Sequence, residues 1–165
     1  MKKTYYDREK AVAYAHQWAY GRNPRYYNFD RLGGDCTNFT SQVLYAGSGV
    51  MNPKPTFGWY YYSLNNRAPA WTGVEFLYKF LVKNLGVGPV GVTSDISQVE
   101  PGDIVQLSFD GMGFSHSPTI VAVGDIPSPS NVLVAAHTFD ADNRPLDTYP
   151  YVSLRFLHIT HVNTW

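Results

Sequence analysis

The chain has 165 residues, of which 44% are hydrophobic and 16% charged, and this composition predicts one folded domain spanning residues 1–165. Its formal net charge is zero, which argues against nucleic-acid binding through a basic surface and gives no sign of a polybasic membrane patch. No apolar run reaches about 18 residues, so no membrane-spanning helix is predicted, and we expect a monomer.

The single cysteine, Cys36, excludes an internal disulfide framework and any metal site built from several thiolates. We therefore expect no metal and no cofactor. The compartment stays open, because Met1–Lys3 is charged like the start of a signal peptide while residues 4–16 supply no apolar segment after it. The chain is expected to be either cytosolic or a mature domain, and an extracellular or cell-wall location is favoured in the second case.

Residues 6–21 are predicted to form a helix. Asp7 can cap its first turn, and Gly21 can end it. The side chains that recur at helical spacing on one face are Ala11, Tyr14, Ala15 and Trp18. Residues 22–34 are predicted to be a loop, since they contain a proline and two adjacent glycines.

Residues 35–47 are predicted to form a second helix. Asp35 is a strong candidate for the residue that caps its start, and Gly47 for the residue that ends it. The stretch TNFTS near its start contains poor helix formers, so something besides propensity must fix this helix. We expect Thr37 and Asn38 to do so through hydrogen bonds to nearby loops.

A long segment follows over residues 47–71, and it is rich in proline, glycine and aromatic residues. Its length favours a functional role, because long irregular segments in small domains are usually functional. Residues 72–86 are then predicted to form a third helix, which begins with a capping box from Thr72 to Glu75 and ends at Gly86.

From Val92 onward the pattern changes to that of β-strands. The four strand candidates are residues 103–109, 116–124, 131–139 and 151–160. Helices followed by successive strands indicate an α+β fold with a mostly antiparallel sheet. Pro118 lies inside the second candidate, where it implies an edge position or a bulge.

Cys36 has two interpretations. A lone cysteine is often a small buried apolar residue. At the start of a helix, however, its thiol would meet unpaired N–H groups, which stabilise a thiolate and can receive the oxyanion formed when that thiolate attacks a carbonyl. The position makes a nucleophile reasonable, and such a nucleophile needs a histidine as its base.

His116 and His137 are the candidate partners of Cys36. His116 opens a predicted strand directly after a glycine-rich turn, and His137 lies in the next predicted strand. If these strands are neighbours, His137 could hold the His116 ring in place. The alternative is that both are satisfied histidines of the core, and the three other histidines are interpreted as surface or structural residues.

The stretch GGDCTNFTSQVLYAG closely resembles the signature of the putative amidase domain family, a branch of the NlpC/P60-like cysteine peptidase superfamily. Further pieces fit that family in order, namely NPRYYNFDRLGGDCTNF, WYY, AWT, PGDIVQL, SHSPTIV and AAHTFDADNRPL. The resemblance covers most of the chain, from about Tyr5 to about Leu157. The chain has Thr37–Asn38 where NlpC/P60 proteins proper usually have serine and glycine, which places it in the amidase branch.

The resemblance implies a papain-like core, in which the helix carrying Cys36 packs on an antiparallel sheet carrying His116. It implies Cys36 as nucleophile, His116 as general base and His137 as the third polar residue. Asp140 is a weaker alternative for that third residue. The auxiliary residues implied around the oxyanion are Tyr26 (with Tyr27 in reserve), Asp35 and Asn38.

The implied activity is hydrolysis of an amide bond through a thioester, in a peptide of the cell-wall peptidoglycan. The residues expected to bind this peptide are Trp59, Tyr60, Tyr61, Trp71 and Ser115. The aromatic members of this set could instead fill the core beneath a long loop. A catalytically inactive or weakly active binding module of the same fold is the alternative to an enzyme.

Overall fold

Seven of the nine strands join in one antiparallel sheet, in a computed structural model that describes residues 1–165. The helices are α1 (Arg8–Trp18), α2 (Cys36–Ser48), α3 (Pro69–Thr72) and α4 (Val74–Lys83). The strands are β1 (Lys2–Thr4), β2 (Tyr61–Ser63), β3 (Asn66–Arg67), β4 (Gly88–Ser94), β5 (Ile104–Ser108), β6 (Thr119–Ala122), β7 (Leu133–Ala136), β8 (Ala141–Pro145) and β9 (Ser153–Thr164).

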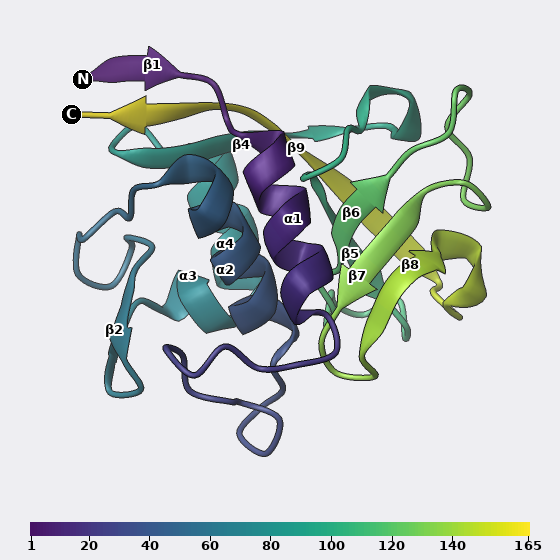
Figure 1. The fold of residues 1–165 in the computed structure, drawn as a ribbon, viewed down its shortest axis with the longest axis horizontal. Helices are drawn as coiled ribbons and strands as arrows, with labels where there is room; N and C mark the ends of the chain where they lie inside the picture. Colours follow the sequence, from purple (N-terminus) through teal and green to yellow (C-terminus); the bar gives the residue numbers. More distant parts are fainter.

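Strand β9 is the longest strand and organises the sheet. Strand β4 pairs along one side of it, β5 and β1 pair along the other side, and the order continues from β5 through β6 and β7 to β8. Because β1 pairs with the end of β9, the two chain termini lie side by side (Figure 1). The predicted α+β class with a mostly antiparallel sheet is confirmed.

Helices α1, α2 and α4 pack on one face of the sheet (Figure 1). The larger hydrophobic cluster lies in this layer and includes Phe39 of α2 and Ile104 of β5. A smaller cluster on the opposite face includes Val105 and Leu107. Side chains of β5 alternate between the two clusters, so this strand is buried on both faces. No helix is both long and apolar enough to cross a bilayer.

The two N-terminal helices begin where the sequence predicts. Asp7 caps α1, since its carboxylate accepts a hydrogen bond from the Lys10 backbone N–H at 3.1 Å. Helix α2 runs past the predicted end at Gly47 and is followed by Gly49, whose φ of 72° is the left-handed conformation that glycine favours. The prediction for Gly47 was wrong because this residue serves a contact between helices.

Gly47 lets α2 pack closely against the start of α1. A Cβ added there would lie 2.3 Å from a ring carbon of Tyr6 and 2.9 Å from the Asp7 carbonyl oxygen. Gly47→Ala is therefore expected to lower the free energy of unfolding by roughly 1–3 kcal/mol in urea denaturation. Gly113→Ala is the control, because nothing lies within 4 Å of its added Cβ. Equal effects of the two substitutions would contradict the close contact.

The predicted helix over residues 72–86 is two helices, α3 and α4. Thr72 is the last residue of α3, and Gly73 separates the helices with an extended backbone of φ −111° and ψ 129°. The Thr72 hydroxyl accepts a hydrogen bond from Arg67 Nε at 3.2 Å, so the predicted capping box does not form. Helix α4 ends at Lys83, before the predicted glycine.

Candidate active site

Cys36 is the first residue of α2 and is partly exposed. Its sulfur lies 3.7 Å from the Thr37 hydroxyl and 3.9 Å from the carbonyl oxygen of Ser115, which is itself exposed. Because a carbonyl oxygen only accepts hydrogen bonds, this arrangement suits a neutral S–H that donates to Ser115. Cys36 thus belongs to neither hydrophobic cluster.

The pKa of the Cys36 thiol is raised above its ordinary value by desolvation, which outweighs the opposing hydrogen bonds from Thr37 and the Ser117 backbone. The start of a helix was expected to favour the thiolate instead. Desolvation is the largest cause of the raised pKa, and the negative charge of Asp35 adds to it. The resting thiol is therefore protonated near neutral pH.

Asp35 is fully buried before α2, but its carboxylate caps no N–H group of that helix. One oxygen accepts hydrogen bonds from the Phe29 backbone N–H at 2.8 Å and from the Asn38 amide at 2.9 Å. The other oxygen lies 2.5 Å from His137 Nδ1. The predicted capping role is wrong, because the carboxylate turns away and leaves the N–H groups beside Cys36 without a side-chain acceptor.

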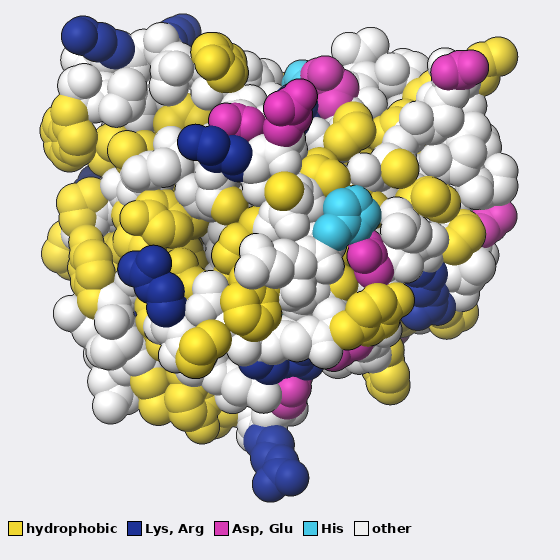
Figure 2. Space-filling view, viewed as in Figure 1, with side chains coloured by type: hydrophobic (Ala, Val, Ile, Leu, Met, Phe, Trp, Pro, Cys, Tyr) yellow, Lys and Arg dark blue, Asp and Glu magenta, His cyan; other side chains and the backbone are white.

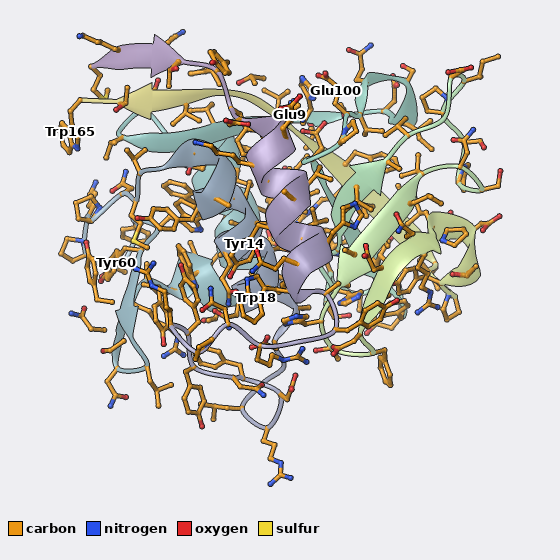
Figure 3. The ribbon with its side chains drawn as sticks, in the orientation of Figure 1. Glu9, Tyr14, Trp18, Tyr60, Glu100 and Trp165 are labelled. Carbon is orange, nitrogen blue, oxygen red and sulfur yellow. The ribbon has the colours of Figure 1, made fainter.

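His137 is 1% exposed, and both of its ring nitrogens are engaged. Nδ1 pairs with Asp35, while Nε2 lies 2.7 Å from the carbonyl oxygen of Trp18, labelled on α1 in Figure 3. Nε2 must therefore carry a hydrogen. The ring also stacks on Phe39, with centroids 4.0 Å apart. His137 thus fixes the residue before the thiol, and it does not orient His116 as the sequence predicts.

The register of β6 and β7 explains why the two histidines stay apart. Thr119 pairs with Ala135, so continuing this register places His137 on the same face as Ser117, toward the helices. His116 is one residue earlier, and strand alternation turns its side chain to the opposite face. The strands are neighbours, as predicted, but the two side chains leave the sheet on different faces.

His116 packs into the smaller hydrophobic layer. Its ring centroid lies 5.7 Å from that of Tyr149 and 6.4 Å from that of Phe109, and its backbone forms an isolated bridge with Leu107. Nε2 is buried without a hydrogen-bond partner. Burial, together with the positive charge of Arg144, lowers the pKa of His116 to about 4, so the ring is neutral at pH 7.

Pro118 sits next to this bridge, where an edge position or a bulge was predicted. Strand β6 lies between β5 and β7, so the edge position is wrong. The β5–β6 ladder keeps one regular pair, Ile104 with Thr119, beside the isolated bridge at His116. Irregular pairing is therefore how the sheet accommodates this proline.

Acidification is expected to destabilise the protein through His116. An ordinary histidine has a pKa of 6.5, whereas the folded value is about 4. Between these values the unfolded chain binds the proton and the native protein does not, so the free energy of unfolding falls as the pH falls. The expected loss is roughly 2–3 kcal/mol between pH 7 and about pH 4.5, measured by urea denaturation.

His116→Phe is the matched variant, since it keeps a ring in the hydrophobic layer and cannot titrate. The stability of this variant should fall less than that of the wild type over the same pH interval, by about the same 2–3 kcal/mol. An identical pH dependence in the two proteins would contradict the assignment to His116.

Thr37 and Asn38 make the contacts expected of them. The Thr37 hydroxyl donates to Ser117 Oγ at 3.4 Å, and the Asn38 amide donates to the Tyr27 carbonyl oxygen at 3.0 Å. The indole N–H of Trp71 donates to the Asn38 carbonyl oxygen at 3.0 Å. This prediction is confirmed, because the poor helix formers of α2 bind segments on both sides of the helix.

Three of the four aromatic residues expected to line a cleft belong to the core. Trp59 and Trp71 are fully buried, and Tyr61 is 7% exposed. The prediction that they bind peptide is wrong, because these rings pack together, with Trp59 and Trp71 centroids 4.9 Å apart. Tyr60 alone is partly exposed, beside β2 (Figure 3), where it stacks on Tyr62.

Tyr26 packs on the same aromatic cluster. Its ring stacks on Trp71 with centroids 5.9 Å apart, and Trp71 in turn binds Asn38 in the first turn of α2. Desolvation raises the pKa of Tyr26, so its hydroxyl keeps a proton and remains a donor. Tyr27, the reserve candidate, is exposed, and its backbone N–H donates to the Tyr61 hydroxyl at 2.8 Å.

Arg22 is the residue of this region that sequence reasoning missed. Its guanidinium donates to the two carboxylate oxygens of Asp140 at 2.9 and 3.0 Å and to Asp30 at 3.1 Å. Its Nε lies 3.5 Å from Asp35. Asp140, the alternative third catalytic residue, is thus engaged by Arg22 and not by His116. No spacing rule connects a loop arginine to aspartates this far apart in the chain.

Charged side chains elsewhere are mixed in sign. On the face shown in Figure 2, positive and negative side chains lie among hydrophobic ones without one large basic patch. No group of three or more His, Cys, Asp or Glu side chains is arranged to hold a metal ion.

The fold and the site define an α+β domain that presents a cysteine at the start of a helix packed on an antiparallel sheet. A family model described as a putative amidase domain matches residues 5–160, and the chain therefore belongs to that family. This membership indicates an amidase-like hydrolase.

The chain is also similar to an uncharacterized protein, YhbB, of Bacillus subtilis (strain 168). The two are 35% identical over 145 residues, which is 84% of this chain and 43% of that protein. The chain thus spans less than half the length of this relative. No solved structure matches the chain.

Proposed function

We propose that the protein is a cysteine-dependent amide hydrolase with Cys36 as its nucleophile. The observation that carries the proposal is the position of the thiol at the first residue of α2, beside N–H groups that no side chain caps. Cys36 is partly exposed and belongs to neither hydrophobic cluster, so core packing does not account for a cysteine at this place. Membership of the putative amidase domain family supports the reaction class.

The proposed reaction has two stages. The thiolate attacks the amide carbonyl carbon, and the oxyanion accepts hydrogen bonds from the Cys36 backbone N–H and the Tyr26 hydroxyl. The base takes the S–H proton of Cys36 before the attack and gives it to the leaving amine as the C–N bond breaks, so that a thioester remains. Water then hydrolyses the thioester to a carboxylate and restores the thiol. One oxyanion donor lowers the barrier by roughly 3 kcal/mol.

We propose His116 as the general base, with its side chain turned toward α2. In the structure no histidine contacts the thiol, so the His116 side chain must rotate toward α2 before the reaction. The buried Nε2 of His116 lacks a partner, which destabilises the resting arrangement by about 1–3 kcal/mol. The carbonyl oxygen of the preceding residue, Ser115, already lies 3.9 Å from the sulfur, and residues 115–118 precede the regular part of β6.

The proposal extends to peptidoglycan peptides as substrates, and to a relationship with the papain-like NlpC/P60 peptidases. Both rest on the resemblance of the stretch Asp35–Phe39 and of the ordered pieces around it. The packing of α2 on an antiparallel sheet agrees with such a core. The resting orientation of His116 differs from that of a papain-like core, because its side chain lies on the face of the sheet opposite α2.

A peptide-binding module without turnover is the second candidate function. The observation that favours it is that the sulfur of Cys36 contacts a hydroxyl and a carbonyl group but no titratable side chain.

Product analysis on purified peptidoglycan tests the proposal. The wild-type protein should release peptides with a new amino group and a new carboxyl group at one amide bond, identified by mass spectrometry. The Cys36→Ala protein should release none. Binding of the peptides by both proteins, with no new amine from either, would overturn the enzyme in favour of the binding module.

A further inference from the structure

We propose that Glu75 and Arg155 form a charged subsite beside Cys36, in which Arg155 binds a carboxylate of the substrate. This inference rests on the proposed function and deepens it, because it names the substrate class as an amide with a free carboxylate near the scissile bond. The buried aromatic residues leave the site without the peptide-binding wall that the sequence predicts, and this pair supplies a different means of recognition.

A cavity of about 520 Å³ reaches the loop that ends directly before Ser115. It is lined by Glu75 at the start of α4, by Arg155 of β9 and by the loop of residues 111–114. The last residue of that loop is followed by Ser115, whose carbonyl oxygen lies 3.9 Å from the Cys36 sulfur. A substrate that lies across the thiol can therefore extend into this cavity.

Buried hydrogen bonds connect the residue after Cys36 to Arg155. The Thr37 hydroxyl and the Gln106 amide both donate to Ser117 Oγ, at 3.4 and 3.2 Å. The side-chain oxygen of Gln106, Oε1, accepts a hydrogen bond from Arg155 Nε at 2.8 Å. Gln106 and Ser117 are fully buried. These contacts hold the guanidinium at a fixed place relative to the nucleophile helix, as specific recognition requires.

Arg155 is also held by two aromatic rings. Its guanidinium carbon lies 3.6 Å from the ring centroid of Tyr78 and 4.1 Å from that of Phe114. The side chain is 18% exposed, so the group remains accessible. A planar guanidinium fixed in this way loses little conformational freedom when it binds a carboxylate through two parallel hydrogen bonds.

Glu75 occupies the place of that carboxylate in the free protein. Its Oε2 lies 2.8 Å from Arg155 Nη2, and its side chain is 50% exposed. An ion pair whose carboxylate is half exposed contributes little to stability, because water screens it. A substrate carboxylate can therefore displace Glu75 from Arg155 with little loss of stability.

The test measures binding to Cys36→Ala protein, which cannot turn the peptide over. The probes are a synthetic peptidoglycan stem peptide with free carboxylates and the same peptide with every carboxylate converted to a primary amide. Isothermal titration should show that the free peptide binds roughly 10–100-fold more tightly. Adding Arg155→Gln should remove this difference, and adding Glu75→Gln should tighten binding of the free peptide. Lys10→Gln, which removes a positive charge from exposed α1, should change neither.

Equal weakening of both peptides by Arg155→Gln would overturn the subsite, because Arg155 would then serve only to tie α4 to β9. Failure of the peptide with free carboxylates to bind would overturn it too. The wild-type protein separates this inference from the proposed function. If the wild-type protein binds the free peptide selectively through Arg155 but cleaves neither peptide, the subsite is supported and the proposed hydrolase activity is contradicted. If the wild-type protein cleaves both peptides at the same rate, the hydrolase activity is supported and the carboxylate subsite is contradicted.

Discussion

Cys36→Ala is expected to slow amide hydrolysis by roughly 10⁴-fold or more while leaving the protein folded. Without the sulfur no thioester can form, and the remaining groups contribute binding and oxyanion stabilisation alone. Cys36 belongs to neither hydrophobic cluster and the substitution removes one atom, so the free energy of unfolding should change by less than about 1 kcal/mol. The two measurements are the rate at which peptidoglycan peptides gain primary amines and a urea denaturation curve.

Cys36→Ser is the control for shape. Serine has nearly the size of cysteine, but its hydroxyl ionises far less readily than a thiol and would need a stronger base to act. We expect the serine variant to be nearly as slow as the alanine variant. Hydrolysis at the wild-type rate in either variant would rule out a cysteine mechanism and would require another nucleophile in this amidase domain.

Elements with their own local pattern could be predicted from the sequence. The start of α1 follows from the cap at Asp7, and β5 follows from a short strand-forming run after the turn at Pro101–Gly102. Strand β1 has no such pattern, because all three of its residues are exposed and it is a strand only through pairing with β9. Strand β8, with the sequence ADNRP, likewise depends on its partner β7.

The same distinction applies to the site. Cys36 could be singled out because a cysteine at a helix start is a local feature of the sequence. The face of the sheet on which the His116 side chain lies could not be predicted. It depends on the register between two strands, and a shift of one residue moves the side chain to the other face. Arg155 and Glu75 are 80 residues apart, and no pattern in either segment indicates that they meet.

His137→Leu is expected to lower the free energy of unfolding by about 3–5 kcal/mol at pH 7. The substitution removes the partner that lies 2.5 Å from the Asp35 carboxylate. Asp35 is fully buried, and the nearest remaining cation is Arg22, with its Nε at 3.5 Å. Removing the partner of a buried charge is among the most destabilising substitutions in a protein. Urea denaturation measures the loss.

His16→Leu is the matched control. His16 also pairs with an aspartate, Asp142, at 2.8 Å, but its side chain is 39% exposed. Water and salt screen such a pair, so its removal should change the free energy of unfolding by less than about 1 kcal/mol. Equal losses in the free energy of unfolding of the two variants would contradict the proposal that burial of the Asp35 carboxylate causes the larger loss.

Asp35→Asn in the His137→Leu background identifies the cause of that loss. If the penalty comes from the uncompensated carboxylate, neutralising it should restore part of the stability, and the two substitutions should deviate from additivity by roughly 1–3 kcal/mol. Additive losses would mean that His137 acts through its stacking on Phe39 and its bond to Trp18. Asp35 directly precedes Cys36, so recovery of stability without recovery of hydrolysis would indicate that the ion pair also positions the thiol.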